Sequence, residues 1–242
     1  MPDTIREFAD RTLDPHVVGF LHSPETPNGT GLILSHGAGG NAQAPMLRSL
    51  GEIFSVAGYT VLRCNLPYRQ ARSFGPPGPA DAARDRAGLR NAIAVMKGLL
   101  GAPFLPDFGS GGDFTKDNDA VSGKLLLGGH SYGGRQASML CADEPDLVAG
   151  LLLLSYPLHP PRRPEQQRTQ HLPDLRTTTL FVSGTRDPFG SVEELQRAIK
   201  MIPAKTKLLT VEGAGHDLGF KGKGKEERLP QEILAEFNRL LS

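Results

Sequence analysis

The stretch Leu125–Gly134 reads LLLGGHSYGG and decides the fold. An apolar run, typical of a buried strand, stops at two glycines, and a helix-like segment follows from residue 135. Between them a single serine, Ser131, has Gly129 and Gly133 two residues away on either side. This spacing predicts a sharp strand–turn–helix in which the serine hydroxyl is lifted out of the sheet. A Cβ at either glycine is expected to collide with the neighbouring chain.

Strand-like and helix-like segments alternate on both sides of this turn. The expected strands span 31–36, 59–67, 124–129, 150–158, 177–184 and 207–213, and the expected helices 44–58, 81–100, 135–143, 191–202 and 230–241. The strands are continuous apolar runs, so both of their faces should be covered. The pattern predicts an α/β fold, a mainly parallel sheet with helices on both faces.

Domain organisation follows from length and composition. The 242 residues suit a single domain over 1–242. Within it, 1–30 is expected to be an N-terminal extension with an edge strand, because 16–24 reads as extended, and 101–123 a long glycine- and aspartate-rich loop. Ser191 and Glu194 have the spacing of a capping box and should start a helix.

Charge, composition and cysteine content limit the kinds of partner and cofactor that can be expected. The net charge of +1 gives no reason to expect nucleic acid, and no apolar stretch approaches the ~20 residues of a membrane span. The N-terminus lacks the features of a secretion signal, which favours a cytoplasmic location. Cys64 and Cys141 are expected to be buried free thiols, no Cys/His cluster has zinc spacing, and neither metal nor cofactor is expected. The oligomeric state is left open.

Candidate catalytic residues lie where the predicted strands end. The site of a parallel sheet lies at the carboxyl ends of its strands. Ser131, Asp187 and His216 each follow one such end, in that order along the chain. A serine hydroxyl needs a base to take its proton, and the base needs an acid to orient it. We therefore expect a Ser131–His216–Asp187 triad.

Two backbone N–H groups should stabilise an oxyanion beside Ser131. Tyr132, directly after the serine, supplies the first donor from a helix N-terminus. The loop after the strand at 31–36 supplies the second, with Ala38 as first choice and Gly39 next. His36 and Gly37 are expected to shape this loop.

Other residues near these strand ends have plainer interpretations. Asp217 is a rival acid, but surface solvation is expected for it, and Asp187 could be a turn aspartate before a proline. His130 should hydrogen-bond locally, and Arg135 should be structural or charge-pairing. The segments 68–72 and 220–228 could attract anionic groups, but solvated loops with exposed arginines and lysines are favoured.

Two alternatives come from other functional classes. Gly37-x-Gly39-x-x-Ala42 fits a dinucleotide-binding fingerprint, although no acidic residue ends the next strand to bind the ribose. A hydrolase fold used only for binding is the other alternative, and the three complementary groups argue against it.

The motifs SHGAGG, VLRCNLPYR, GGHSYGGRQAS, SGTRDPFG and GAGHDL together resemble the α/β-hydrolase superfamily from about residue 31 to the C-terminus. More narrowly, the chain is similar to small dienelactone-hydrolase-like proteins grouped with the testis-expressed and NSL-complex-subunit hydrolase domains. The resemblance implies Ser131 as nucleophile, Asp187 as acid and His216 as base. Relatives often carry lysine where this chain has His130.

The segment 159–179 is too short and proline-rich for a helical lid. An open site acting on a small or soluble acyl ester or thioester is therefore expected. The partner of the site would be a small molecule.

Overall fold

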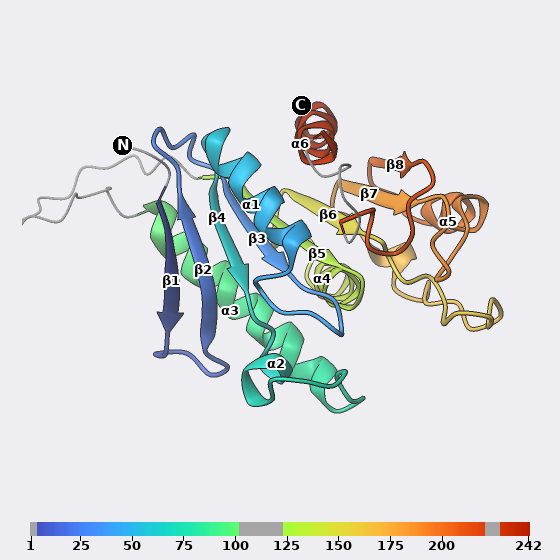
Figure 1. Cartoon of the computed structure of the whole chain (residues 1–242), viewed down its shortest axis with the longest axis horizontal. Helices are drawn as coiled ribbons and strands as arrows, with labels where there is room; N and C mark the ends of the chain where they lie inside the picture. The colour runs from blue at the N-terminus through green and yellow to red at the C-terminus, as the bar shows by residue number, and fades with distance from the viewer. Residues whose placement is uncertain (1–3, 102–122, 221–227) are drawn as a thin grey trace, which may run out of the picture.

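The computed structural model describes residues 4–101, 123–220 and 228–242. Its centre is an eight-stranded sheet in the order β1-β2-β4-β3-β5-β6-β7-β8, which Figure 1 shows from β1 at one edge to β8 at the other. The strands are β1 (Thr4–Asp10), β2 (Val17–Ser23), β3 (Gly31–Ser35), β4 (Thr60–Cys64), β5 (Leu125–His130), β6 (Gly150–Leu154), β7 (Thr179–Gly184) and β8 (Thr206–Val211).

All pairs from β4 to β8 are parallel, whereas β2 runs antiparallel to both β1 and β4. This confirms the mainly parallel sheet predicted from the sequence. Every residue of β3, β6 and β7 is buried, as expected for strands covered on both faces.

Helices cover both faces of the sheet. They are α1 (Pro45–Val56), α2 (Pro67–Ala71), α3 (Asp81–Gly101), α4 (Tyr132–Asp143), α5 (Val192–Ile199) and α6 (Leu229–Leu241), with a short 3₁₀ turn at Leu172–Asp174. The predicted capping box begins α5: Ser191 Oγ accepts from the Glu194 N–H, and the Glu194 carboxylate accepts from the Ser191 N–H.

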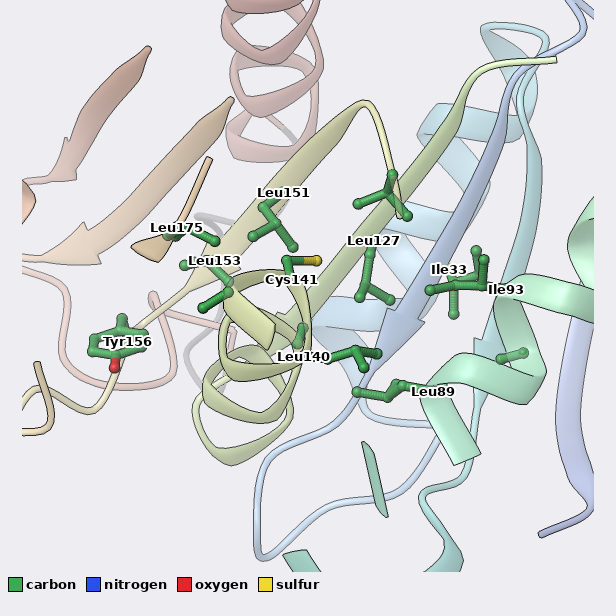
Figure 2. Packing of buried hydrophobic residues seen from close by; sticks show 14 of the residues in the cluster. Ile33, Leu89, Ile93, Leu127, Leu140, Cys141, Leu151, Leu153, Tyr156 and Leu175 are labelled. Carbon is green, nitrogen blue, oxygen red and sulfur yellow. The ribbon is translucent and has the colours of Figure 1, made fainter. Parts of the chain in front are cut away.

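Two separate apolar clusters form the core, one on each face. Leu47, Leu50 and Phe54 of α1 join Phe237 of α6 against one face of the sheet. The other face packs against α3, α4 and α5, and Figure 2 shows Leu89 and Ile93 of α3 and Leu140 and Cys141 of α4 directed at side chains of β3, β5 and β6. Cys64 and Cys141 are both buried and free, as expected, and burial raises the pKa of each thiol to about 12.

Two elements were not predicted from the sequence. β1 is exposed and its sequence has no apolar alternation, because Arg6, Glu7 and Asp10 interrupt its few apolar residues. Charges of this kind suit an unpaired edge. α2 has five residues, too few for a helical periodicity, and was predicted as a solvated loop. The structure corrects that prediction, because Tyr68 and Arg69 of α2 are buried.

The segment between β6 and β7 carries only the 3₁₀ turn, so no large lid is present in the described residues. Among the same residues, no helix combines the length and apolarity needed to cross a bilayer. Nearly all of the predicted loop 101–123 lies outside the described residues, as do 221–227.

Candidate active site

Ser131 is the residue at which β5 turns into α4. It has φ 50° and ψ −114°, a left-handed backbone that a residue with a Cβ rarely adopts. Its N–H donates to the carbonyl of Leu154 on the neighbouring strand β6, at 2.8 Å. This bond holds the strained turn in place. Strain of this kind persists only where the surrounding structure enforces it, and it is concentrated at functional sites.

The glycines around Ser131 are required by close packing of the backbone. A Cβ on Gly129 would lie 2.5 Å from the nitrogen of Gly134. A Cβ on Gly133 would lie 2.6 Å from the carbonyl oxygen of His36. The elbow is therefore pressed against the loop after β3, and both positions admit no side chain.

His216 lies between Ser131 and Asp187. Its Nε2 is 2.8 Å from Ser131 Oγ, and its Nδ1 is 2.8 Å from Asp187 Oδ2 and 3.0 Å from Oδ1. The Asp187 side chain is 2% exposed and that of His216 is 22% exposed. The carboxylate is thus shielded, while the imidazole faces a cavity.

The segments after β7 and β8 are joined by backbone contacts that fix this arrangement. The N–H of Arg186 donates to the carbonyl of Ala214 at 2.9 Å, and the N–H of Gly213 donates to Thr185 Oγ1 at 2.9 Å. Because β7 and β8 are neighbours in the sheet, their ends meet. Asp187 and His216, 29 residues apart, are thereby placed side by side.

His130 supports His216 from the other side. Its Nε2 hydrogen-bonds the carbonyl oxygen of His216 at 2.9 Å, so Nε2 carries a proton. Burial lowers the pKa of His130 to about 4, which keeps its ring neutral. His130 was expected to bond locally, but its partner lies 86 residues further along the chain.

The loop after β3, on which the oxyanion donors were expected, is held in place by buried hydrogen bonds. The carbonyl of Gly37 lies 2.9 Å from His36 Nδ1 and 3.2 Å from the hydroxyl oxygen of Tyr68. The N–H of Leu66 donates to His36 Nε2 at 3.1 Å, so Nδ1 carries the proton that it donates to Gly37. His36 is buried and shapes this loop.

A cavity of about 730 Å³ opens beside these groups, within the usual size range of small-molecule sites. Ser131, His216 and the loop 36–40 line it, together with apolar side chains from both sides. Those apolar side chains are Ala44, Pro45, Met46, Leu47, Phe189 and Phe220.

The remaining predicted residues have clear positions. Asp217 lines the cavity and accepts from the Gly219 N–H, so it closes its own turn. Arg135 is half-buried, its N–H donates to the Ser131 carbonyl, and none of the described carboxylates pairs with its side chain. Most of the basic segment 220–228 lies outside the described residues.

The alternative glycine fingerprint also lies at this cavity. Gly37 and Gly39 line it beside Ser131, and the Gly40 N–H closes a tight turn onto the Gly37 carbonyl. The following helix begins only at Pro45, so its N-terminus does not follow the glycine turn directly. A dinucleotide fingerprint needs the helix to start at the turn.

Comparison with known protein families places this chain in one of them. Residues 112–241 match the model of a family described as an alpha/beta hydrolase domain. The chain belongs to this family and is an α/β hydrolase.

Solved structures share the fold over nearly the whole chain. A dienelactone hydrolase from Anabaena variabilis is 19% identical, with a TM-score of 0.71 over 99% of this chain and 98% of that one. An α/β serine hydrolase homologue from Coxiella burnetii is 14% identical, with a TM-score of 0.70 over 96% of each chain. An α/β serine hydrolase without lid from Xanthomonas campestris is 14% identical, with a TM-score of 0.67 over 99% of this chain and 96% of that one.

Proposed function

We propose that this α/β hydrolase is a serine hydrolase that cleaves small or soluble acyl esters or thioesters through an acyl-enzyme. The single observation that carries the proposal is the position of His216, in hydrogen-bonding contact with Ser131 Oγ through Nε2 and with Asp187 through Nδ1. A base that contacts a nucleophile and is itself oriented by an acid is the arrangement that activates serine.

In the first half-reaction, His216 Nε2 takes the proton of Ser131 Oγ as the oxygen attacks the acyl carbon. The tetrahedral intermediate collapses, the bond to the leaving group breaks, and His216 returns the proton to that group. Water then attacks the acyl carbon as His216 Nε2 takes its proton. The bond to Ser131 Oγ breaks, this oxygen takes the proton back from His216, and the carboxylic acid is released. Asp187 keeps the proton on Nδ1 and stabilises the imidazolium.

The tetrahedral oxyanion accepts hydrogen bonds from the backbone. Tyr132 is the first residue of α4, so its N–H has no partner within the helix. The Ser131 N–H is already bonded to Leu154 and is not available. Ala38 supplies the second donor, with Gly39 next to it.

The cavity supports a neutral, compact substrate. Its described lining is mostly apolar, and Asp217 is the one carboxylate on it. The lack of a large lid among the described residues leaves few walls for a long acyl chain. The dienelactone-hydrolase-like proteins, with the testis-expressed and NSL-complex-subunit group, are the subfamily that the sequence motifs favour.

A fluorophosphonate probe, which reacts only with activated serines, tests the proposal. We expect covalent labelling at Ser131, and loss of both labelling and p-nitrophenyl butyrate hydrolysis in Ser131→Ala. Labelling elsewhere, or full turnover in Ser131→Ala, contradicts the proposal.

Ser155→Ala is a matched control. Ser155 follows the neighbouring strand β6, has the same left-handed backbone (φ 48°), and is buried, but its Oγ has no hydrogen-bond partner in the described structure. It should be labelled and active like the wild type.

A further inference from the structure

We propose that Tyr68 and Asp85 are positioning residues that hold the two oxyanion donors in fixed relation to each other. Asp85 was not a candidate from the sequence, and Tyr68 was named there only as part of the segment 68–72, which was expected to be a solvated loop. The inference rests on the proposed function, since it concerns how that site binds the oxyanion.

Tyr68 acts on the loop that carries Ala38. Its hydroxyl donates to the Ala38 carbonyl at 2.9 Å and lies 3.2 Å from the Gly37 carbonyl. In a trans peptide the C=O and N–H point in opposite directions. Because the Gly37 carbonyl points toward Tyr68, the Ala38 N–H of the same peptide points away from Tyr68. The Ala38 carbonyl also points toward Tyr68, so the Gly39 N–H points away from Tyr68 as well.

Asp85 acts on both sides of the oxyanion site. Its Oδ2 accepts from the hydroxyl of Tyr132 at 2.7 Å, and its Oδ1 accepts from the backbone N–H of Tyr68 at 3.0 Å. One carboxylate on α3 thus connects the residue after the nucleophile with the residue that orients the Ala38 loop. The side chains of Tyr68 and Tyr132 also meet edge to face, with ring centroids 5.8 Å apart.

The connection is buried, which makes it rigid. Asp85 is 0% exposed and Tyr68 is 2% exposed. Burial raises the pKa of Asp85, while the hydrogen bonds from Tyr132 and Tyr68 oppose that rise. A buried carboxylate is costly unless its acceptors are satisfied, and here both oxygens are used.

Arg69 reinforces the same loop. Its guanidinium donates to the carbonyls of Ala38 at 3.0 Å and Gly40 at 2.9 Å, and it lies 5.0 Å from the Tyr68 ring centroid. The buried polar groups of α2 therefore converge on the loop 37–40. Their shared effect is to fix backbone N–H directions, which matters most when negative charge develops in the transition state.

Tyr68→Phe removes only the hydroxyl and keeps the ring. We expect kcat for p-nitrophenyl butyrate to fall about 10- to 100-fold with KM within about threefold, because the donor is misplaced in the transition state and not in the ground state. The inhibition constant of butylboronic acid, whose serine adduct is tetrahedral, should rise by a similar factor.

Tyr156→Phe is the matched control. Tyr156 is also buried, and its hydroxyl also donates to a backbone carbonyl, that of Arg168, at 2.6 Å, away from the cavity. It should lose stability like Tyr68→Phe but keep kcat and the boronate inhibition constant within twofold of the wild type.

Asp85→Asn tests the connection itself. An amide keeps the shape but can accept on one oxygen only, so we expect a fall in kcat, again with little change in KM. Unchanged kcat and boronate affinity in both Tyr68→Phe and Asp85→Asn, in a wild type that is labelled at Ser131, would overturn the inference and leave the proposed function intact. A wild type that is not labelled overturns both.

Discussion

The ring of Phe189 lies against the imidazole of His216, with centroids 4.2 Å apart and planes inclined by 32°. Phe189 is two residues after Asp187, and its N–H donates to Asp187 Oδ1 at 2.9 Å. The turn that presents the carboxylate therefore also places an aromatic face on the imidazole. This face restricts the ring to one orientation and favours a cation when the imidazolium forms.

Replacing Phe189 by leucine should lower kcat about 2- to 10-fold, because a contact of this kind contributes about 0.5–1.5 kcal/mol. Steady-state kinetics with p-nitrophenyl butyrate measure the effect. Phe74→Leu changes an aromatic residue that is 83% exposed and should leave kcat unchanged. Equal rates in both variants would show that the stacking has no catalytic effect.

Asp187→Asn should lower kcat by about 10³- to 10⁴-fold, because an amide at this position holds the wrong imidazole tautomer. Asp217→Asn is the control, since Asp217 follows His216 directly and also lines the cavity, but its carboxylate accepts from the Gly219 N–H. We expect a change of less than about threefold for it. A larger loss of kcat in Asp217→Asn than in Asp187→Asn would show that Asp217 is the acid and that the assignment of Asp187 is wrong.

Gly133→Ala should destabilise the fold, although alanine is favoured over glycine in a helix by about 1 kcal/mol. The added Cβ would lie 2.6 Å from the His36 carbonyl oxygen, and overpacking of this kind costs about 1–3 kcal/mol or more. Gly39→Ala is the comparison, because no atom lies within 4 Å of its added Cβ. Thermal unfolding should show a lower midpoint for Gly133→Ala only.

Acyl-chain length should have little effect on kcat/KM beyond the first few carbons. Each CH₂ buried in a tunnel contributes about 0.8 kcal/mol, which would make kcat/KM climb steeply with length. p-Nitrophenyl acetate and butyrate should therefore be hydrolysed at least as well as the palmitate ester. A steady rise in kcat/KM from two to sixteen carbons would instead indicate a long acyl tunnel.

Acid should destabilise the protein as the pH falls from about 6.5 to about 4. Burial lowers the pKa of four histidines, His22, His36, His130 and His171, from 6.5 to about 4, so between these values the unfolded chain binds protons that the folded chain does not. Stability is complete above pH 6.5 and is lost toward pH 4, by up to about 3 kcal/mol for each histidine.

Urea unfolding at pH 7 and pH 4.5 measures this loss. It should be smaller in His22→Gln than in the wild type, because that variant lacks one of these four histidines. His16→Gln removes an exposed histidine and should keep the wild-type loss. An equal loss in all three proteins would show that His22 does not contribute.

The sequence by itself determined the strand–turn–helix at Ser131 and the order of the groups that follow the strands. Both are local: an apolar run predicts a buried strand, and a turn whose backbone packs this closely needs glycine. Parallel strands then bring their carboxyl ends to one edge, so residues after successive strands could be expected to meet. β1 and α2 escaped prediction because a charged edge strand and a five-residue helix carry no clear periodicity.

Only the tertiary structure decided which polar groups become partners. Arg69 looks like a solvated arginine in the sequence, yet it is only 8% exposed. Its guanidinium donates to the carbonyls of Gly40 and Ala38, which lie some 30 residues earlier in the chain. Asp85 looks like one of several acids on α3, yet α3 packs so that this carboxylate meets Tyr68 and Tyr132. Such contacts depend on how separate segments pack around the sheet, and neither spacing nor residue type encodes them locally.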